Sequence, residues 1–127
     1  MAGTLIWSVI ACISLVAIDG DSISCDGVAM QDVGPGEPNV SGYAAPDLVL
    51  PACAREELWG SQAKVILQDL LDAPGTVVED SGERDRYGLP LVRVKLADGR
   101  TAGEELIRLR YAVAWKPGET FAWCNAL

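Results

Sequence analysis

The sequence predicts one domain of the α+β class that is mainly β. Short apolar or alternating runs occur before residue 33 and again after residue 75, and Gly, Pro or Asp turn signals bound them. Two further segments repeat apolar residues near a 3.6-residue spacing, which is typical of helices. The expected order of elements is β-β-β-α-β-β-α. A length of 127 residues suits a single domain with its own core.

The first three strands are predicted at residues 10–18, 22–25 and 28–32. The first is an almost unbroken apolar run, as expected of a buried strand. Asp26-Gly27 is a strong hairpin signal between the other two. Residues 33–51 are rich in Gly and Pro and are expected to form a long loop, a type of segment that is usually functional or mobile in a small domain.

The clearest helix is predicted at residues 54–71. The Asp-Ala-Pro-Gly sequence at residues 72–75 ends it, since Pro and Gly do not continue a helix. Its expected apolar face consists of Leu58, Val65, Ile66, Leu70 and Leu71.

The last part of the chain is predicted to hold two strands and a helix. Strands at residues 76–79 and 91–96 flank a charged turn segment at 80–90. Asp98-Gly99 then turns the chain into a shorter helix at residues 101–111, and residues 112–115 leave it as an apolar tail. Trp115 in this tail is expected to pack in the core or against a helix.

The charge balance argues against a nucleic-acid surface. The chain has 10 basic and 18 acidic residues, a net charge of −8 and no His. Nucleic-acid binders normally carry a basic stripe, so we expect weak or no binding of nucleic acid and consider a protein partner instead. The lack of His also removes the commonest transition-metal ligand and the usual general base at neutral pH. We expect a monomer.

The cysteines favour two disulfides. Cys12, Cys25, Cys53 and Cys124 are even in number, widely spaced and without a C-x-x-C pair, a pattern that suits a disulfide-bonded, periplasmic or secreted protein. Three pairings are open. Cys12 with Cys25 would join two strands across a turn, and Cys53 with Cys124 would tie the segment before the helix to the C-terminal region. Four buried thiols in a cytosolic protein remain the alternative.

The N-terminal segment is ambiguous. Residues 5–18 have the length of a signal-peptide core and are too short for a membrane span, but no Lys or Arg precedes them and no cleavage site follows. We therefore interpret residues 1–8 as an N-terminal extension or anchor remnant and residues 9–127 as the domain. No stable membrane span is expected.

Asp19-Gly20-Asp21 is the first candidate for a site. Two carboxylates follow a strand and flank a glycine that permits a sharp bend, which makes a fair site for a hard cation such as Ca²⁺. A solvated turn between two strands is the other interpretation.

Three segments carry a family resemblance. They are Val-Ala-Ile-Asp-Gly-Asp-Ser-Ile at residues 16–23, Asp-Arg-Tyr-Gly-Leu at 85–89, and Gly-Glu-Glu-Leu-Ile at 103–107 with Tyr-Ala-Val-Ala-Trp at 111–115. Their order and spacing over residues 9–124 resemble the staphylococcal nuclease (thermonuclease) family. The resemblance implies an OB-type five-stranded β-barrel with two to three helices.

The resemblance also implies a chemistry that this chain has largely lost. Members of the family cleave DNA and RNA with one Ca²⁺, two Arg that stabilise the phosphoryl charge, and a Glu that orients water. Asp21 matches a metal ligand, and Asp19 matches its acidic neighbour. The positions of the two Arg, the second metal carboxylate and the Glu are occupied by Gln31, Leu89, Gly36 and Asn39.

Three functions remain open from the sequence. A degenerate nuclease-like domain, without efficient phosphodiesterase activity, would serve as a binding or structural module. A divergent Ca²⁺-dependent nuclease would hold its metal with Asp19 and Asp21 and use Glu37 and either Arg84 or Arg86 as catalytic residues. An acidic barrel would bind a basic protein partner.

Overall fold

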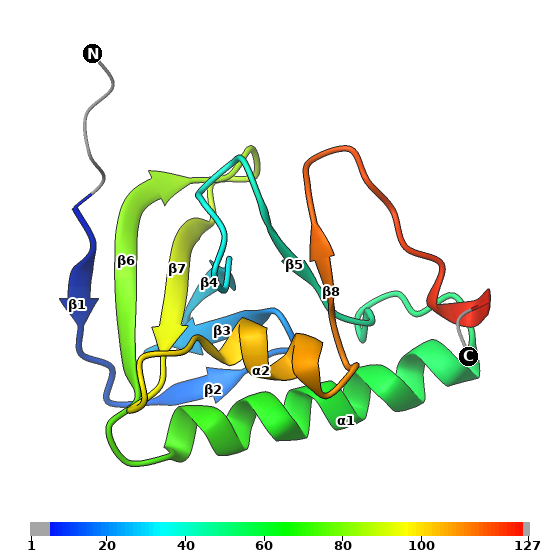
Figure 1. The fold of residues 1–127 in the computed structure, drawn as a ribbon, viewed down its shortest axis with the longest axis horizontal. Coiled ribbons are helices and arrows are strands. Elements are labelled where there is room, and N and C mark those ends of the chain that lie inside the picture. The colour runs from blue at the N-terminus through cyan, green and yellow to red at the C-terminus, as the bar shows by residue number, and fades with distance from the viewer. Residues whose placement is uncertain (1–5, 126–127) are drawn as a thin grey trace.

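A curled sheet and two helices enclose the core (Figure 1). The computed structural model describes residues 6–125; residues 1–5 and 126–127 lie outside the described part. The α+β, mainly β class predicted from the sequence is confirmed. The strands are β1 Ser8–Ile10, β2 Leu15–Ala17, β3 Ser22–Cys25, β4 Val28–Asp32, β5 Gly42–Ala44, β6 Val77–Arg84, β7 Pro90–Lys95 and β8 Val113–Trp115, and the helices are α1 Ala54–Asp72, α2 Ala102–Arg108 and the 3-10 turn η1 Trp123–Asn125.

The main sheet has six strands in the order β1-β6-β7-β4-β3-β2, and β5 and β8 form a separate pair. The β3 and β4 predictions are confirmed at both ends, and the Asp26-Gly27 turn between them has φ of 50° and 86°, as a two-residue hairpin requires. The parallel pairing of β4 with β7, in which Asp32 lies opposite Val92, joins the two halves of the sheet.

The apolar run at residues 10–18 is not one strand. Its first residue, Ile10, ends β1, which pairs with β6, and Leu15–Ala17 forms β2, which pairs with β3, so its two ends lie at opposite edges of the sheet. Ile13 between them is fully exposed. Strand propensity specifies an extended backbone but not a partner, so an apolar run can supply two edges. The proposed start of the domain at residue 9 stays a prediction; the ring of Trp7 already lies 4.1 Å from the Arg93 guanidinium carbon.

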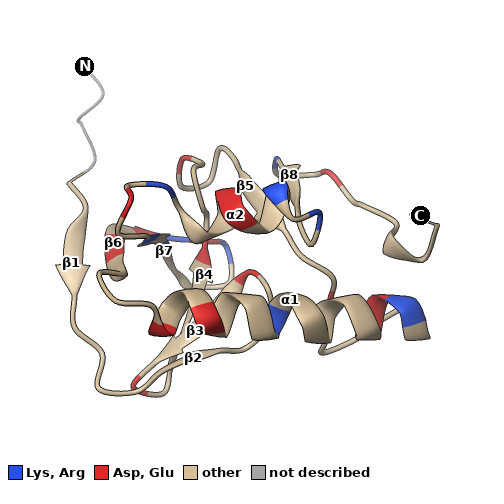
Figure 2. Ribbon diagram, turned by 60° about the horizontal axis from the view of Figure 1, so that its bottom comes forward, with Lys and Arg blue, Asp and Glu red and all other residues tan. Residues whose placement is uncertain are grey.

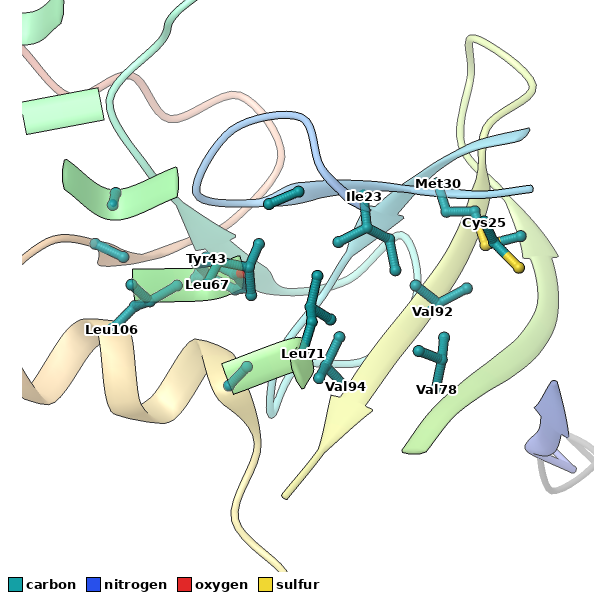
Figure 3. Packing of buried hydrophobic residues seen from close by; sticks show 14 residues of the cluster. Ile23, Cys25, Met30, Tyr43, Leu67, Leu71, Val78, Val92, Val94 and Leu106 are labelled. Carbon is teal, nitrogen blue, oxygen red and sulfur yellow. The ribbon is translucent and has the colours of Figure 1, made fainter. Parts of the chain in front are cut away.

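The core lies between the sheet and the helices, with Ile23, Val92, Val94, Leu67 and Leu106 among its members (Figure 3). The predicted long helix is confirmed and runs one residue further, but its predicted face is partly wrong. Leu58 and Val65 are each 60% exposed. The buried positions of α1 are Glu56, Gly60, Ala63, Leu67 and Leu71.

Small residues decide which face of α1 is buried. A Cβ on Gly20 would lie 2.8 Å from Cβ of Ala63, and a Cβ on Gly60 would lie 2.9 Å from the carbonyl oxygen of Pro46. These separations are below normal contact distances, so the helix can approach only where it presents Gly and Ala. The apolar spacing in the sequence did not include these positions.

Three further boundaries differ from the sequence predictions. The predicted loop at residues 33–51 contains β5, which pairs with β8 in the predicted apolar tail. β6 continues five residues beyond residue 79 with a register shift before Arg84, so it includes part of the predicted charged turn. The shorter helix ends at Arg108 rather than at residue 111, and Arg110 with φ of 67° follows it.

Two disulfides link Cys12 to Cys25 and Cys53 to Cys124, the pairing that the positions in the sequence suggested. The first joins the segment that crosses from β1 to β2, residues 11–14, to the end of β3. The second joins the start of α1 to η1, where the ring of Trp123 meets that of Trp59 edge-on at 6.0 Å. No helix within residues 6–125 is long and apolar enough to cross a membrane.

Candidate functional site

A cavity of about 570 Å³ opens between the end of β4, strand β5, the turn after β6 and the segment that follows β8. Its volume is within the usual range of small-molecule pockets. Segments far apart in the sequence form its walls, and the residues that bear on its chemistry are described in turn below.

Asp32, the last residue of β4, is a buried carboxylate at this cavity, with 1% of its surface exposed. Its Oδ1 accepts a hydrogen bond from Gly34 N–H at 2.9 Å, and its Oδ2 accepts one from the Tyr43 hydroxyl at 2.7 Å. The hydroxyl also lies 2.9 Å from the carbonyl oxygen of Gly20. Burial raises the pKa of Asp32 to about 6, although these hydrogen bonds oppose the shift.

Asp19 and Asp21 have different roles in their turn. Asp19 Oδ1 accepts hydrogen bonds from Asp21 N–H at 3.1 Å and from the Ser22 hydroxyl at 2.6 Å, so this carboxylate closes the turn. Asp21 lines the cavity, and its Oδ2 accepts a hydrogen bond from Ala45 N–H at 3.1 Å. Burial, followed by the nearby charge of Asp19, raises the pKa of Asp21 well above its usual value.

Gly20 does not serve the sharp bend that the sequence suggested, since its φ is not in the left-handed region. A Cβ at this position would lie 2.6 Å from Cβ of Ala45 and 2.8 Å from Cβ of Ala63. The glycine is needed for close approach of the turn to α1, which fixes Asp21 relative to the helix.

The structure brings together two of the five predicted site residues. Asp21 and Arg86 line the cavity, whereas Asp19 is engaged in its turn. Glu37 is exposed on the loop after β4, outside the cavity wall. The Arg84 guanidinium donates a hydrogen bond to the carbonyl oxygen of Gly88 at 2.8 Å. The metal-binding and catalytic roles of these residues stay predictions.

Of the four positions at which the sequence departs from the nuclease pattern that it resembles, three line the same cavity. Gln31, Asn39 and Leu89 line it together with Asp21. Gly36 lies outside it, and a Cβ there would come within 2.5 Å of the carbonyl oxygen of Ser41. The wall therefore presents neutral side chains at the positions that the resemblance aligned with two Arg and a Glu.

The described residues do not include a preformed cluster of acidic metal ligands. Within the described residues no group of three or more His, Cys, Asp or Glu side chains is placed to hold a metal ion. Asp32 Oδ1 and Oδ2 each accept one hydrogen bond, from Gly34 and Tyr43. Ca²⁺ takes about six to eight oxygen ligands, and of the two predicted metal ligands Asp21 alone lines the cavity in the described residues.

The sequence did not identify Asp32, Tyr43 or Trp115 as site residues. Trp115 is only partly buried and lines the cavity instead of packing in the core, and its indole N–H donates to the carbonyl oxygen of Glu119 at 2.8 Å. The sequence contains two signals for them: Asp32 ends a predicted strand, and Tyr43 lies within a Gly- and Pro-rich segment.

The cavity is acidic overall. Its wall contains the carboxylates of Asp21, Asp32, Asp85 and Glu119 and a single Lys or Arg among its lining residues, Arg86. Lys and Arg elsewhere are spread over several elements, including both helices (Figure 2).

No family model matches the chain, and no curated protein sequence does either.

Proposed function

We propose that this protein is a binding module of the staphylococcal-nuclease-like type that has lost efficient nuclease activity. The observation that carries the proposal is the cavity wall, where Gln31, Asn39 and Leu89 meet beside Asp21. In the resemblance these are the positions of two cations and a general base. The curled sheet with α1 against it is compatible with the proposed OB-type barrel.

The physical argument concerns the charge that develops during cleavage. Phosphodiester hydrolysis places negative charge on the phosphoryl oxygens, and preorganised cations stabilise it. Removal of one such donor typically lowers the rate by about 10²–10³. Here Arg86 remains among the lining residues, and its guanidinium carbon lies 4.9 Å from the centre of the exposed Tyr87 ring. The lining carboxylates would oppose the approach of a phosphate.

We also propose that the protein works outside the cytosol, in the periplasm or secreted. Two disulfides in a domain of this size support this, because reducing compartments rarely retain them.

The test is a cleavage assay with single-stranded DNA and RNA at micromolar protein, in Ca²⁺ and in chelator. We expect no Ca²⁺-dependent turnover above background. Robust turnover that Asp21→Ala abolishes would instead establish the divergent nuclease.

A second candidate, an acidic domain that binds a basic protein partner, is favoured by the charge of the cavity wall and the net charge of −8. Retention of a basic protein that weakens with salt, with no retention on DNA, would distinguish it from a nucleic-acid binder.

A further inference from the structure

We propose that the cavity binds the cationic side chain of a basic peptide, with a guanidinium group as its preferred ligand. This inference rests on the proposed function, because it names the ligand class of the same cavity. Three observations in one place carry it: a cavity, an excess of carboxyl groups over cations in its lining, and aromatic side chains at its wall.

Carboxylate oxygens remain for a ligand at the cavity wall. Asp85 uses Oδ1 to accept hydrogen bonds from Tyr87 N–H and Leu89 N–H, at 2.8 and 2.9 Å. Glu119 uses Oε1 to accept one from Lys116 N–H at 2.7 Å. The second oxygen of each carboxylate accepts no hydrogen bond from the described residues. A planar guanidinium can be bound by two such oxygens at once.

Two aromatic side chains give the cavity a second means of cation recognition. Tyr87 is 75% exposed at the cavity wall, and Arg86 of the same chain already lies over its ring at 4.9 Å. The geometry of this turn therefore accommodates a guanidinium on the ring face. Trp115 also lines the cavity, and its hydrogen bond to Glu119 restrains the orientation of the indole.

The carboxyl groups at the cavity disfavour an anionic ligand such as a phosphate. Among the described residues, neither Asp21 nor Asp32 forms an ion pair with a Lys or Arg side chain. The cavity lining has four carboxyl groups and one cationic side chain, Arg86. Such a wall repels a phosphate and attracts an organic cation, and a cavity of about 570 Å³ has room for an arginine side chain.

Arg86 makes the proposal distinctive. If the ligand is a cation, Arg86 competes with it for the Tyr87 ring and repels it. Removing this residue should then strengthen binding, whereas a nucleotide or phosphate ligand would bind more weakly without it. The sign of the effect separates the two classes.

The experiment titrates the full chain with N-acetyl-arginine methylamide and follows Trp fluorescence, with Trp115→Phe to assign the signal. The citrulline analogue is the uncharged control. We expect a dissociation constant of about 1 mM or lower for the arginine compound, since a fragment of this size reaches about 0.3 kcal/mol per atom. The citrulline analogue should bind at least about tenfold more weakly, because it lacks the charge-assisted hydrogen bonds.

The variants test the site. Arg86→Gln should tighten arginine binding about twofold to fivefold, the range of exposed charge interactions, while Lys64→Gln on the outer face of α1 makes the same charge change and should have no effect. Asp21→Asn should weaken binding about tenfold, with Asp69→Asn as its exposed control.

Each other outcome overturns the inference. Equal binding of citrulline would show that charge is not recognised, and no binding at about 20 mM would remove the site. Weaker binding in Arg86→Gln, or preferential binding of thymidine 3′,5′-bisphosphate, would assign an anionic ligand. None of these results requires nuclease turnover, so the cleavage assay tests the proposed function separately.

Discussion

The two disulfides should stabilise the protein by different amounts. Cys12 and Cys25 are 13 residues apart, and Cys53 and Cys124 are 71 apart. Because the entropy removed from the unfolded chain grows with the logarithm of the closed loop, the shorter loop should contribute about 2.9 kcal/mol and the longer one about 4.4 kcal/mol at 25 °C. Reduction of the second bond should therefore cost about 1.5 kcal/mol more.

Two double variants isolate these contributions. Cys12→Ala with Cys25→Ala leaves only the longer loop, and Cys53→Ala with Cys124→Ala leaves only the shorter one. The free energy of unfolding of each is measured in urea with and without a reductant, so packing changes caused by alanine cancel within each variant. The reasoning is refuted if reduction destabilises the protein with only the Cys12–Cys25 bond as much as the protein with only the Cys53–Cys124 bond.

Three further predictions concern the pH dependence of stability and the packing of α1. Asp32→Asn should flatten the pH dependence of stability: the folded state keeps the proton of Asp32 up to about pH 6, whereas an unfolded Asp releases it near pH 3.9, so the free energy of unfolding of the unmodified protein should rise by about 2.3 kcal/mol from this group as the pH falls from 7 to 4. Urea titrations at each pH, compared between the two proteins, measure the difference, and parallel profiles would disprove it. Gly20→Ala should destabilise the protein by about 1–3 kcal/mol through overpacking; if the contact with the helix is the cause, Ala63→Gly in the same chain recovers part of the loss in thermal unfolding. Leu67→Ala should cost about 2–5 kcal/mol and Val65→Ala less than about 0.5 kcal/mol, and equal losses in denaturant would contradict the observed burial of α1.

Local signals in the sequence predicted the elements whose partners are close in the chain. The hairpin of β3 and β4 followed from Asp26-Gly27 between two strand-forming runs, and α1 followed from its length and its Pro-Gly stop. β5 and β8 were missed because their pairing brings Tyr43 opposite Ala114, and neither segment is strongly strand-forming alone.

The candidate site was predictable only in part. Asp21 could be found because a short motif contains it. Asp32 and Tyr43 could not, since their relation depends on a hydrogen bond between β4 and β5 and on burial, which no spacing in the sequence encodes. The acidic character of the cavity was indicated only by the total charge, which does not say where the carboxylates gather.

The crossing segment between β1 and β2 sets a geometric limit on the sheet. Five residue steps separate Ile10 from Leu15, and an extended chain of that length spans at most about 18 Å. A flat sheet of six strands would place its outer strands about 24 Å apart, at about 4.8 Å per strand. The edges therefore cannot both be reached unless the sheet bends. The short tether between its two ends makes the curvature a property of chain connectivity, and a longer tether would let the sheet open while every strand kept its neighbours.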